Sequence, residues 1–187
     1  MDVGYRRAFT LVVPESGGAS CVVLVSQDRA AVLSLGGYQT GTVTEVLNRR
    51  GVRSVETLCL PMQDADVLEG AAQVLEKYGT RQLVLPQGTY RDQSLEEAPE
   101  ALYLEGGDTF QALPGVTAEV LPRWEGVRLN LYGVEVLVEW EKAQKQQCEI
   151  LVTCLEKSLV NSSFTVWQTD AIIEEITQFP QGGESLV

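Results

Sequence analysis

The sequence predicts an α/β protein in which β-sheets are covered by helices on their outer faces. Short runs rich in Val, Leu and Ile alternate along the chain with amphipathic helical stretches. Strand-like runs dominate the first third, two strand–helix units follow, and further strand-like runs come after them. That order favours sheets with helices packed outside over a closed all-β barrel. At 187 residues, of which 44% are hydrophobic, the chain is long enough to bury a core as one domain.

Each expected strand is short, apolar and bounded by Gly, Pro, Asn or Asp, as strands with a buried face usually are. In the run VEVLVEW (134–140), valines alternate with Glu135, Leu137 and Glu139, so one face of that strand turns two carboxylates toward solvent. In chain order the expected strands cover residues 9–13, 21–26, 30–34, 57–60, 82–85, 101–104, 118–121, 127–132, 134–138, 150–154 and 171–173.

Two helices are expected from the 3.6-residue period of apolar side chains, and a glycine ends each of them. The first covers residues 42–50 and stops at Gly51, and the second covers residues 66–78 and stops at Gly79. A third helix is expected over residues 140–147. The second helix has one apolar stripe, made of Val67, Leu68, Ala71, Val74, Leu75 and Tyr78.

The composition excludes several kinds of site. The chain contains no histidine, so Ser-His-Asp and Cys-His chemistry lack their imidazole base. The four cysteines form no C-x-x-C pair, and we expect buried free thiols.

With 14 basic and 26 acidic residues the net charge is −12, which repels phosphate backbones. Arg49, Arg50 and Arg53 form the most basic stretch, and we interpret them as complementing a helix dipole rather than binding nucleic acid.

The stretch LPMQDADVLEG, from Leu60 to Gly70, joins a predicted strand to the second helix. One interpretation is helix capping, with Asp66 at the N-cap, Glu69 at N3 as an approximate capping box, and Asp64 favouring the same positive helix end. A cap of this kind contributes about 1 kcal/mol, which is enough to retain an aspartate without any metal. The alternative is weak binding of Mg²⁺ or Ca²⁺ by the two carboxylates. Capping is the favoured interpretation.

Three segments also match a known set of motifs in the right order. The opening MDVGYRRAFTLVV is similar to L-D-V-G-Q-G-D-A, and AVLSLGGY is similar to L-I-D-x-G-G. The stretch LPMQDADVLEG is similar to L-T-H-x-D-x-D-H-x-G-G without gaps, and weaker likenesses follow in VEVLVEWEKA (a strand ending T-G-D) and CEILVTCLEKS (a segment with paired histidines). The chain therefore resembles, over nearly its whole length, the metallo-β-lactamase-like domain of the DNA-internalisation competence proteins, the ComEC family.

This resemblance implies an αββα sandwich of two mixed β-sheets with outer helices. In such domains one or two metal ions at the sheet edges activate water to hydrolyse esters or phosphodiesters. The parent protein would be a multi-spanning membrane channel for incoming DNA. Residues 1–178 would then be a soluble domain excised from it, associated with the cell membrane only through the parent, and residues 179–187 a loose tail.

Carried over position by position, the resemblance implies that the metal ligands are largely replaced. Met62 and Val67 stand where the third motif has histidines, while Asp64 and Asp66 match its two acidic positions. Met and Val do not coordinate a hard, hydrolytic divalent ion, so we expect both to pack and to give the former cleft a drier lining.

The other ligand positions are changed as well. Ser34 replaces the aspartate of L-I-D-x-G-G, and Trp140 aligns most nearly with the aspartate of T-G-D. Glu139, Glu141 and Glu156 offer carboxylates nearby, but we expect them on solvated faces. The paired histidines align with Leu155 and Glu156, and the Q-G-D positions are Tyr5, Arg6 and Arg7.

These observations predict a non-catalytic domain with a structural or partner-binding role, no cofactor, and Asp64 and Asp66 as the vestige of a metal site. Its partners would be the parent channel or the competence machinery, and the −12 charge argues against direct nucleic-acid binding. Two alternatives stay open: a Mg²⁺- or Mn²⁺-dependent hydrolase or nuclease with a carboxylate-only site, and an acidic α/β binding module unrelated to DNA uptake. Two facing sheets would support the family, whereas a single doubly wound sheet would refute it.

Overall fold

The computed structural model describes residues 6–13, 21–35, 41–98, 101–140, 148–155 and 162–165, with the backbone alone at residues 6–8, 148–155 and 162–165. The helices are α1 (Gly41–Arg49), α2 (Ala65–Tyr78) and two 3-10 turns, η1 (Gln93–Leu95) and η2 (Pro122–Trp124). No described helix is both long and apolar enough to cross a bilayer. The strands are β1 (Arg6–Val13), β2 (Val22–Ser26), β3 (Arg29–Ser34), β4 (Ser54–Cys59), β5 (Gln82–Pro86), β6 (Ala101–Leu104), β7 (Thr109–Leu113), β8 (Val116–Val120), β9 (Gly126–Leu131), β10 (Val134–Glu139), β11 (Cys148–Leu155) and β12 (Ser162–Thr165).

The described strands form two mixed sheets. The large sheet has the order β11-β1-β2-β3-β4-β5-β6, and its strands β3 to β6 are parallel to one another while β11, β1, β2 and β3 pair antiparallel. The small sheet has the order β12-β10-β9-β8-β7 and is antiparallel except for the β10–β12 pair.

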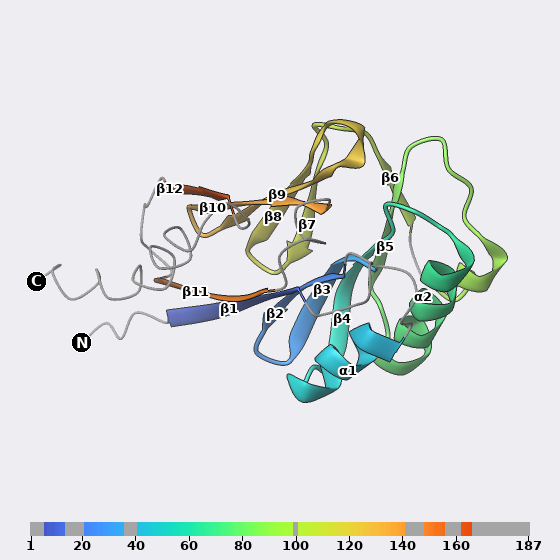
Figure 1. Cartoon of the computed structure of the whole chain (residues 1–187), viewed down its shortest axis with the longest axis horizontal. Helices are drawn as coiled ribbons and strands as arrows, with labels where there is room; N and C mark the ends of the chain where they lie inside the picture. Colours follow the sequence, from blue (N-terminus) through green and yellow to red (C-terminus); the bar gives the residue numbers. More distant parts are fainter. Residues whose placement is uncertain are drawn as a thin grey trace, which may run out of the picture.

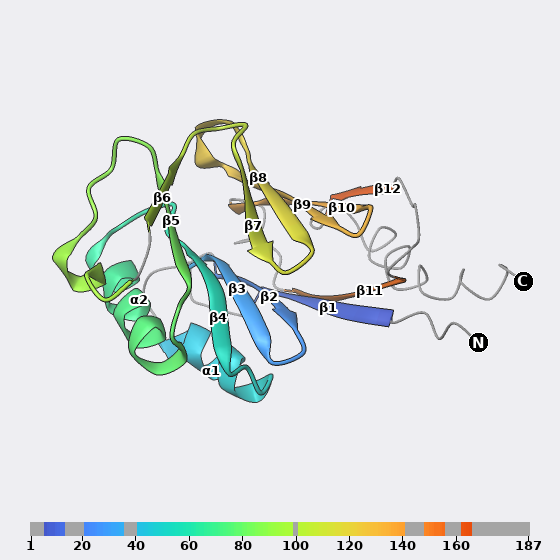
Figure 2. The ribbon, with the colours of Figure 1, turned by 180° about the vertical axis from the view of Figure 1, so that it is seen from behind.

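The two sheets face each other, and the helices lie outside. Figure 1 shows the small sheet over one face of the large sheet and α1 and α2 on the opposite face, and the reverse view in Figure 2 agrees. This arrangement confirms the predicted α/β sandwich of two mixed sheets and excludes a single doubly wound sheet. Among the described residues no helix covers the outer face of the small sheet, and residues 141–147, where the third helix is expected, lie outside them.

Burial explains why the strands of the large sheet are continuously apolar. On β2, Val22 and Leu24 belong to the core between the two sheets, whereas Val23 and Val25 belong to the core under the helices. The small sheet is buried on its inner face only. On β10, Val134, Val136 and Val138 are buried and the residues between them are half-buried, as the alternation predicts.

The sequence located most strands correctly, but it missed two strands and the starts of others. β4 begins at Ser54 and β8 at Val116, each earlier than expected. β7 and β12 were not predicted at all. In β7 the exposed side chains of Thr109 and Gln111 alternate with buried ones in a run of only five residues, which is too short and too polar to be recognised alone. The expected strand at 171–173 and the tail at 179–187 lie outside the described residues.

Because β3, β4, β5 and β6 run in parallel, their ends define two edges of the large sheet. We call the edge where these strands end the carboxyl edge, which contains Ser34, Cys59, Pro86 and Leu104. The edge where they begin, which contains Arg29, Ser54, Gln82 and Ala101, is the amino edge.

Candidate functional site

The stretch that begins at Leu60 lies at the carboxyl edge, in the turn from β4 to α2. The Leu60 N–H donates to the carbonyl oxygen of Val84 at 3.0 Å, and the Leu60 side chain is fully buried. The chain then leaves the sheet at Pro61 and enters α2 at Ala65. In open α/β sheets ligands bind beyond the carboxyl ends of the parallel strands, so this turn occupies the position where such a sheet places a site.

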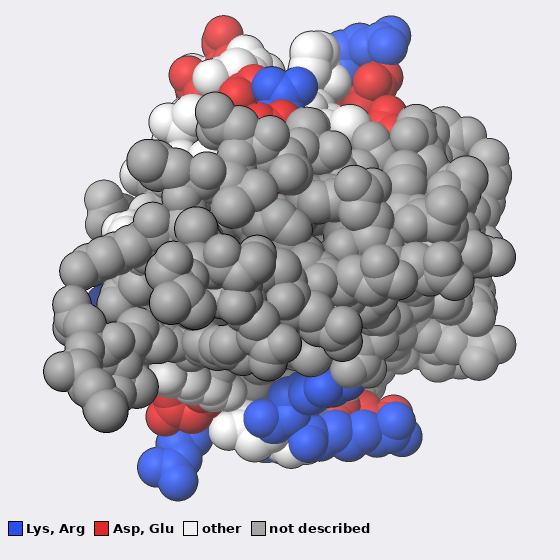
Figure 3. Space-filling model, turned by 90° about the vertical axis from the view of Figure 1, so that its left-hand side faces the viewer, with Lys and Arg blue, Asp and Glu red and all other residues white. Residues whose placement is uncertain are grey.

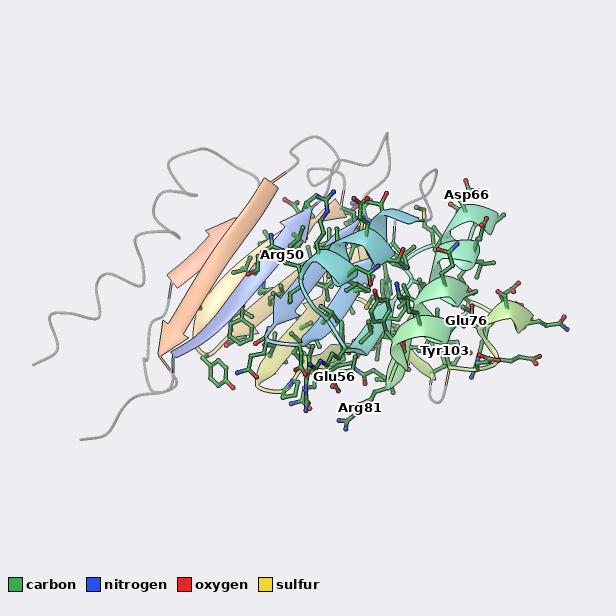
Figure 4. All side chains as sticks on the ribbon, turned by 90° about the horizontal axis from the view of Figure 1, so that it is seen from below. Arg50, Glu56, Asp66, Glu76, Arg81 and Tyr103 are labelled. Carbon is green, nitrogen blue, oxygen red and sulfur yellow. The ribbon has the colours of Figure 1, made fainter. Side chains whose placement is uncertain are left out.

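Asp64, and not Asp66, caps α2. The backbone of Asp64 is extended (φ −74°, ψ 168°), and its Oδ1 accepts a hydrogen bond from the Val67 N–H at 2.9 Å. The helix begins at Ala65, so the expected capping box between Asp66 and Glu69 is wrong. Asp66 lies in the first turn with an exposed side chain, which projects away from the sheets in Figure 4.

The two positions expected to pack behave differently. Val67 is 1% exposed and lies in the core between α2 and the large sheet, as predicted. The prediction for Met62 is wrong, because its side chain is 60% exposed. Between them, Gln63 Nε2 donates to the backbone oxygen of Tyr90 at 3.0 Å, and the Tyr90 side chain is 94% exposed. The turn is therefore tied to the loop after β5 and has an exposed thioether and phenol rather than a dry lining.

Ser34 and Trp140 lie at the same end of the sandwich as this turn. Ser34 ends β3 and is 4% exposed. Trp140 follows β10, is 8% exposed, and donates its backbone N–H to the Glu125 oxygen at 2.8 Å, while its indole N–H has no partner in the described part of the chain. Glu139 lies half-buried on the outer face of the small sheet, away from the space between the sheets.

The alignment of Leu155 with a ligand histidine is wrong. β11 runs antiparallel to β1, and Leu155 pairs with Arg6 at the start of β1. Because β1 runs in the same direction as β3, the end of β11 lies at the amino edge, away from Asp64. Glu141, Glu156 and Tyr5 lie outside the described residues.

One residue at the carboxyl edge that sequence reasoning missed is Trp124. Its Nε1–H donates to the Leu104 oxygen at 2.9 Å, which fastens the small sheet to the end of β6. Arg123 and Trp124 both have positive φ (56° and 57°), a left-handed conformation that non-glycine residues rarely adopt. The only sequence signal is the proline before them, because neither Arg nor Trp favours this conformation.

The described side chains near the carboxyl edge offer little for catalysis or metal binding. In the ranges that the structure covers, no three His, Cys, Asp or Glu side chains come together to hold a metal ion. Cys21 and Cys59 are free and buried, as expected. Burial raises the pKa of Cys21 to about 12 and raises the pKa of Cys59 as well, so neither supplies a thiolate nucleophile near neutral pH.

Comparison with solved structures that have the same arrangement of sheets and helices identifies the fold. Zinc-bound PqqB from Methylobacterium extorquens superposes with a TM-score of 0.51 at 13% identity, covering 70% of this chain and 61% of that chain. The chemotaxis sensor ODP, in its peroxy diiron form, gives a TM-score of 0.51 at 15% identity, covering 71% of this chain and 59% of that one. Both are metallo-β-lactamase-fold proteins. The chain has a metallo-β-lactamase-like fold.

At these identities the likeness shows the fold alone. The chain spans about 60% of the length of the two structures. No protein-family model and no curated protein sequence matches the chain. In this metallo-β-lactamase-like fold, the turn at Met62–Val67 and the end of β10 are brought to one edge, whereas the end of β11 is not.

The cap gives a direct test of which aspartate the helix needs. We expect Asp64→Ala to lower the free energy of unfolding by about 1 kcal/mol, because the Val67 N–H loses its acceptor. Asp66→Ala should change it by less than about 0.5 kcal/mol, because the lost dipole interaction is offset by the better helix propensity of alanine. Urea unfolding of both variants measures the difference. Equal losses would contradict the assignment of the cap to Asp64.

Proposed function

We propose that this chain is a non-catalytic metallo-β-lactamase-like domain with a structural or partner-binding role. The observation that carries the proposal is the chemistry of the turn after β4. Asp64 gives its carboxylate to a helix N–H, Val67 is aliphatic and buried, and the chain has no histidine. A hydrolytic metal centre needs nitrogen and carboxylate ligands that converge on the ion and leave a position for water. The residues at this turn do not fit such a centre.

The proposed context is a DNA-uptake protein of the competence type, and the support for it is the order of the motifs. The segments that begin at Met1 and Ala31 and the turn at Leu60 follow the ComEC pattern in sequence. The partner in this context is the parent channel or another protein of the uptake machinery. The net charge of −12 favours a protein partner over direct contact with a nucleic-acid backbone.

Metal titration tests the first part of the proposal. We expect millimolar Zn²⁺, Mn²⁺ or Mg²⁺ to leave the melting temperature unchanged, because a ligand raises apparent stability only by binding the native state. We also expect no phosphodiester or ester hydrolysis above the buffer rate with any of the three metals. A rise in melting temperature that saturates with metal and disappears in Asp66→Ala would instead establish a carboxylate-only metal site, and metal-dependent hydrolysis lost in the same variant would establish the hydrolase.

A genetic experiment tests the context. In the natural host, removal of the coding segment should abolish or strongly lower uptake of external DNA, whereas the double substitution Asp64→Asn, Asp66→Asn should leave uptake at the parental level. Normal uptake after removal of the segment would reject the competence role while leaving the non-catalytic assignment standing. Loss of uptake in the double variant, with the folded protein still present, would reject the non-catalytic assignment.

A further inference from the structure

A polar pocket lies at the amino edge of the sandwich, at the opposite end from the turn after β4. It has a volume of about 310 Å³ and opens between the starts of β4 and β5 and the end of β7. This volume is near the lower bound of pockets that hold small molecules. The lining residues are Glu56, Thr57, Arg81, Gln82 and the segment 111–114.

Hydrogen bonds between the two sheets fix the wall of this pocket. Thr57 Oγ1 donates to the Ala112 oxygen at 2.9 Å. Gln82 Nε2 donates to Thr57 Oγ1 and to the Gln111 oxygen, both at 2.7 Å. Because these bonds connect β4, β5 and β7, the pocket is already formed without a ligand.

A β-bulge in β4 positions Glu56, the carboxylate residue that lines the pocket. Ala30 pairs with Val55 and Ala31 pairs with Thr57, so Glu56 is an extra residue in β4. Bulges of this kind redirect a side chain and often occur beside binding sites. The Glu56 side chain is only 10% exposed, and its two oxygens contact different arginines: Oε1 lies 3.3 Å from Arg29 Nη1, and Oε2 lies 3.3 Å from Arg81 Nη1.

The charges at the pocket favour an anion. Two guanidinium groups face one carboxylate, which gives a local excess of one positive charge in a chain of net charge −12. Arg81 is 74% exposed at the side chain and uses only Nη1 on Glu56, so its other N–H groups have no partner among the described residues. Figure 4 shows Arg81 beside Glu56 and extending outward. A guanidinium with free N–H groups binds carboxylate or phosphate oxygens with two parallel hydrogen bonds.

We propose that this pocket binds a small organic molecule through a phosphate or carboxylate group held by Arg81. Arg29 does not line the pocket but adds positive charge beside it through its ion pair with Glu56, and Glu56 contacts both guanidinium groups. Gln111 supplies an amide group for polar parts of the ligand, whereas the Gln82 NH2 group is already bonded within the wall and leaves only its amide oxygen. Leu113 and Pro114 form the apolar part of the wall. The proposal concerns the edge opposite to the turn of Asp64 and does not depend on the function proposed above.

Titration of the folded chain with inorganic phosphate, and separately with succinate, tests the proposal. Amide NMR shifts are followed at constant ionic strength, so that a general salt effect is excluded. We expect saturable shifts for amides at residues 56–57, 81–82, 111–113 and 115 with at least one anion. Which anion binds distinguishes the phosphate from the carboxylate. No saturable shift with either anion would overturn the proposal.

Two variants and a matched control locate the binding. Arg81→Gln should weaken the anion about tenfold, because the loss of a charge-assisted bidentate contact is of that order. Gln111→Glu should weaken it as well, since it adds a negative charge to the lining without removing Arg81 or Glu56. Arg53→Gln removes the same charge from an exposed residue of the amino edge that does not line the pocket, and we expect a change of less than about twofold. Equal weakening in Arg81→Gln and Arg53→Gln would overturn the proposal.

Discussion

Replacement of Gly126 by alanine is expected to lower the free energy of unfolding by more than about 4 kcal/mol, or to prevent folding. A Cβ at this position would lie 1.9 Å from the Val138 carbonyl oxygen and 2.9 Å from the Glu139 Cα. Both atoms belong to the backbone of β10, and Gly126 pairs with Glu139 in that ladder. Neither β9 nor β10 can move away without separating the small sheet at the end where Trp124 and Trp140 lie. Urea unfolding and the yield of soluble protein measure the effect.

Gly41→Ala is the matched control for this substitution. Gly41 is the first residue of α1, and a Cβ there would meet no atom of the described residues within 4 Å. We expect no loss of stability, and a gain of a few tenths of a kcal/mol is consistent with the helix propensity of alanine. If Gly126→Ala unfolded at the same urea concentration as Gly41→Ala, the close approach of β9 to β10 would be refuted.

Truncation of Leu83 to alanine is expected to lower the free energy of unfolding by about 2–5 kcal/mol. Leu83 lies in the middle of the large sheet on β5, is fully buried, and belongs to the core under the helices. The substitution removes buried methyl groups and leaves a cavity that the flanking strands β4 and β6 prevent from collapsing. Chemical denaturation monitored by circular dichroism gives the change.

Leu137→Ala is the control for Leu83→Ala. Leu137 is also in the middle of a strand, but it is half-buried on the outer face of the small sheet. We therefore expect a loss of about 1 kcal/mol or less. A loss equal to that of Leu83→Ala would show that a further layer covers this face and would complete the predicted outer helices on both sides of the sandwich.

The architecture could be predicted from the sequence because the order of apolar and polar residues along each strand matches which of its faces are buried. Strands of the large sheet are apolar on both faces, and β10 alternates, so both could be recognised without a partner strand. β7 could not, because its pairing with β8 and its contact with β4 through Thr57 arise only in three dimensions.

The candidate turn was located correctly, but its details were not. Two aspartates two residues apart offer two positions for the N-cap of α2. Glu69 made Asp66 the expected cap because it completes a capping box. The extended backbone of Asp64 shows that Asp64 is the cap instead. The alignment of Leu155 followed sequence order alone, which contains no information on strand direction. The pocket at the amino edge was missed because Glu56, Arg81 and Gln111 come from three separate segments.

The pairing of β1 with β11 has a consequence for how the chain folds. Residues 6–13 form a ladder with residues 148–155 along the whole length of both strands. One side of β1 therefore has no partner until nearly all of the domain has left the ribosome, and closing that ladder joins parts of the chain that are very distant in sequence. Contacts of this range slow folding, and an unpaired strand edge invites pairing with a neighbouring chain. Until residue 148 is available, β1 therefore leaves an unpaired strand edge that raises the risk of aggregation of the nascent protein.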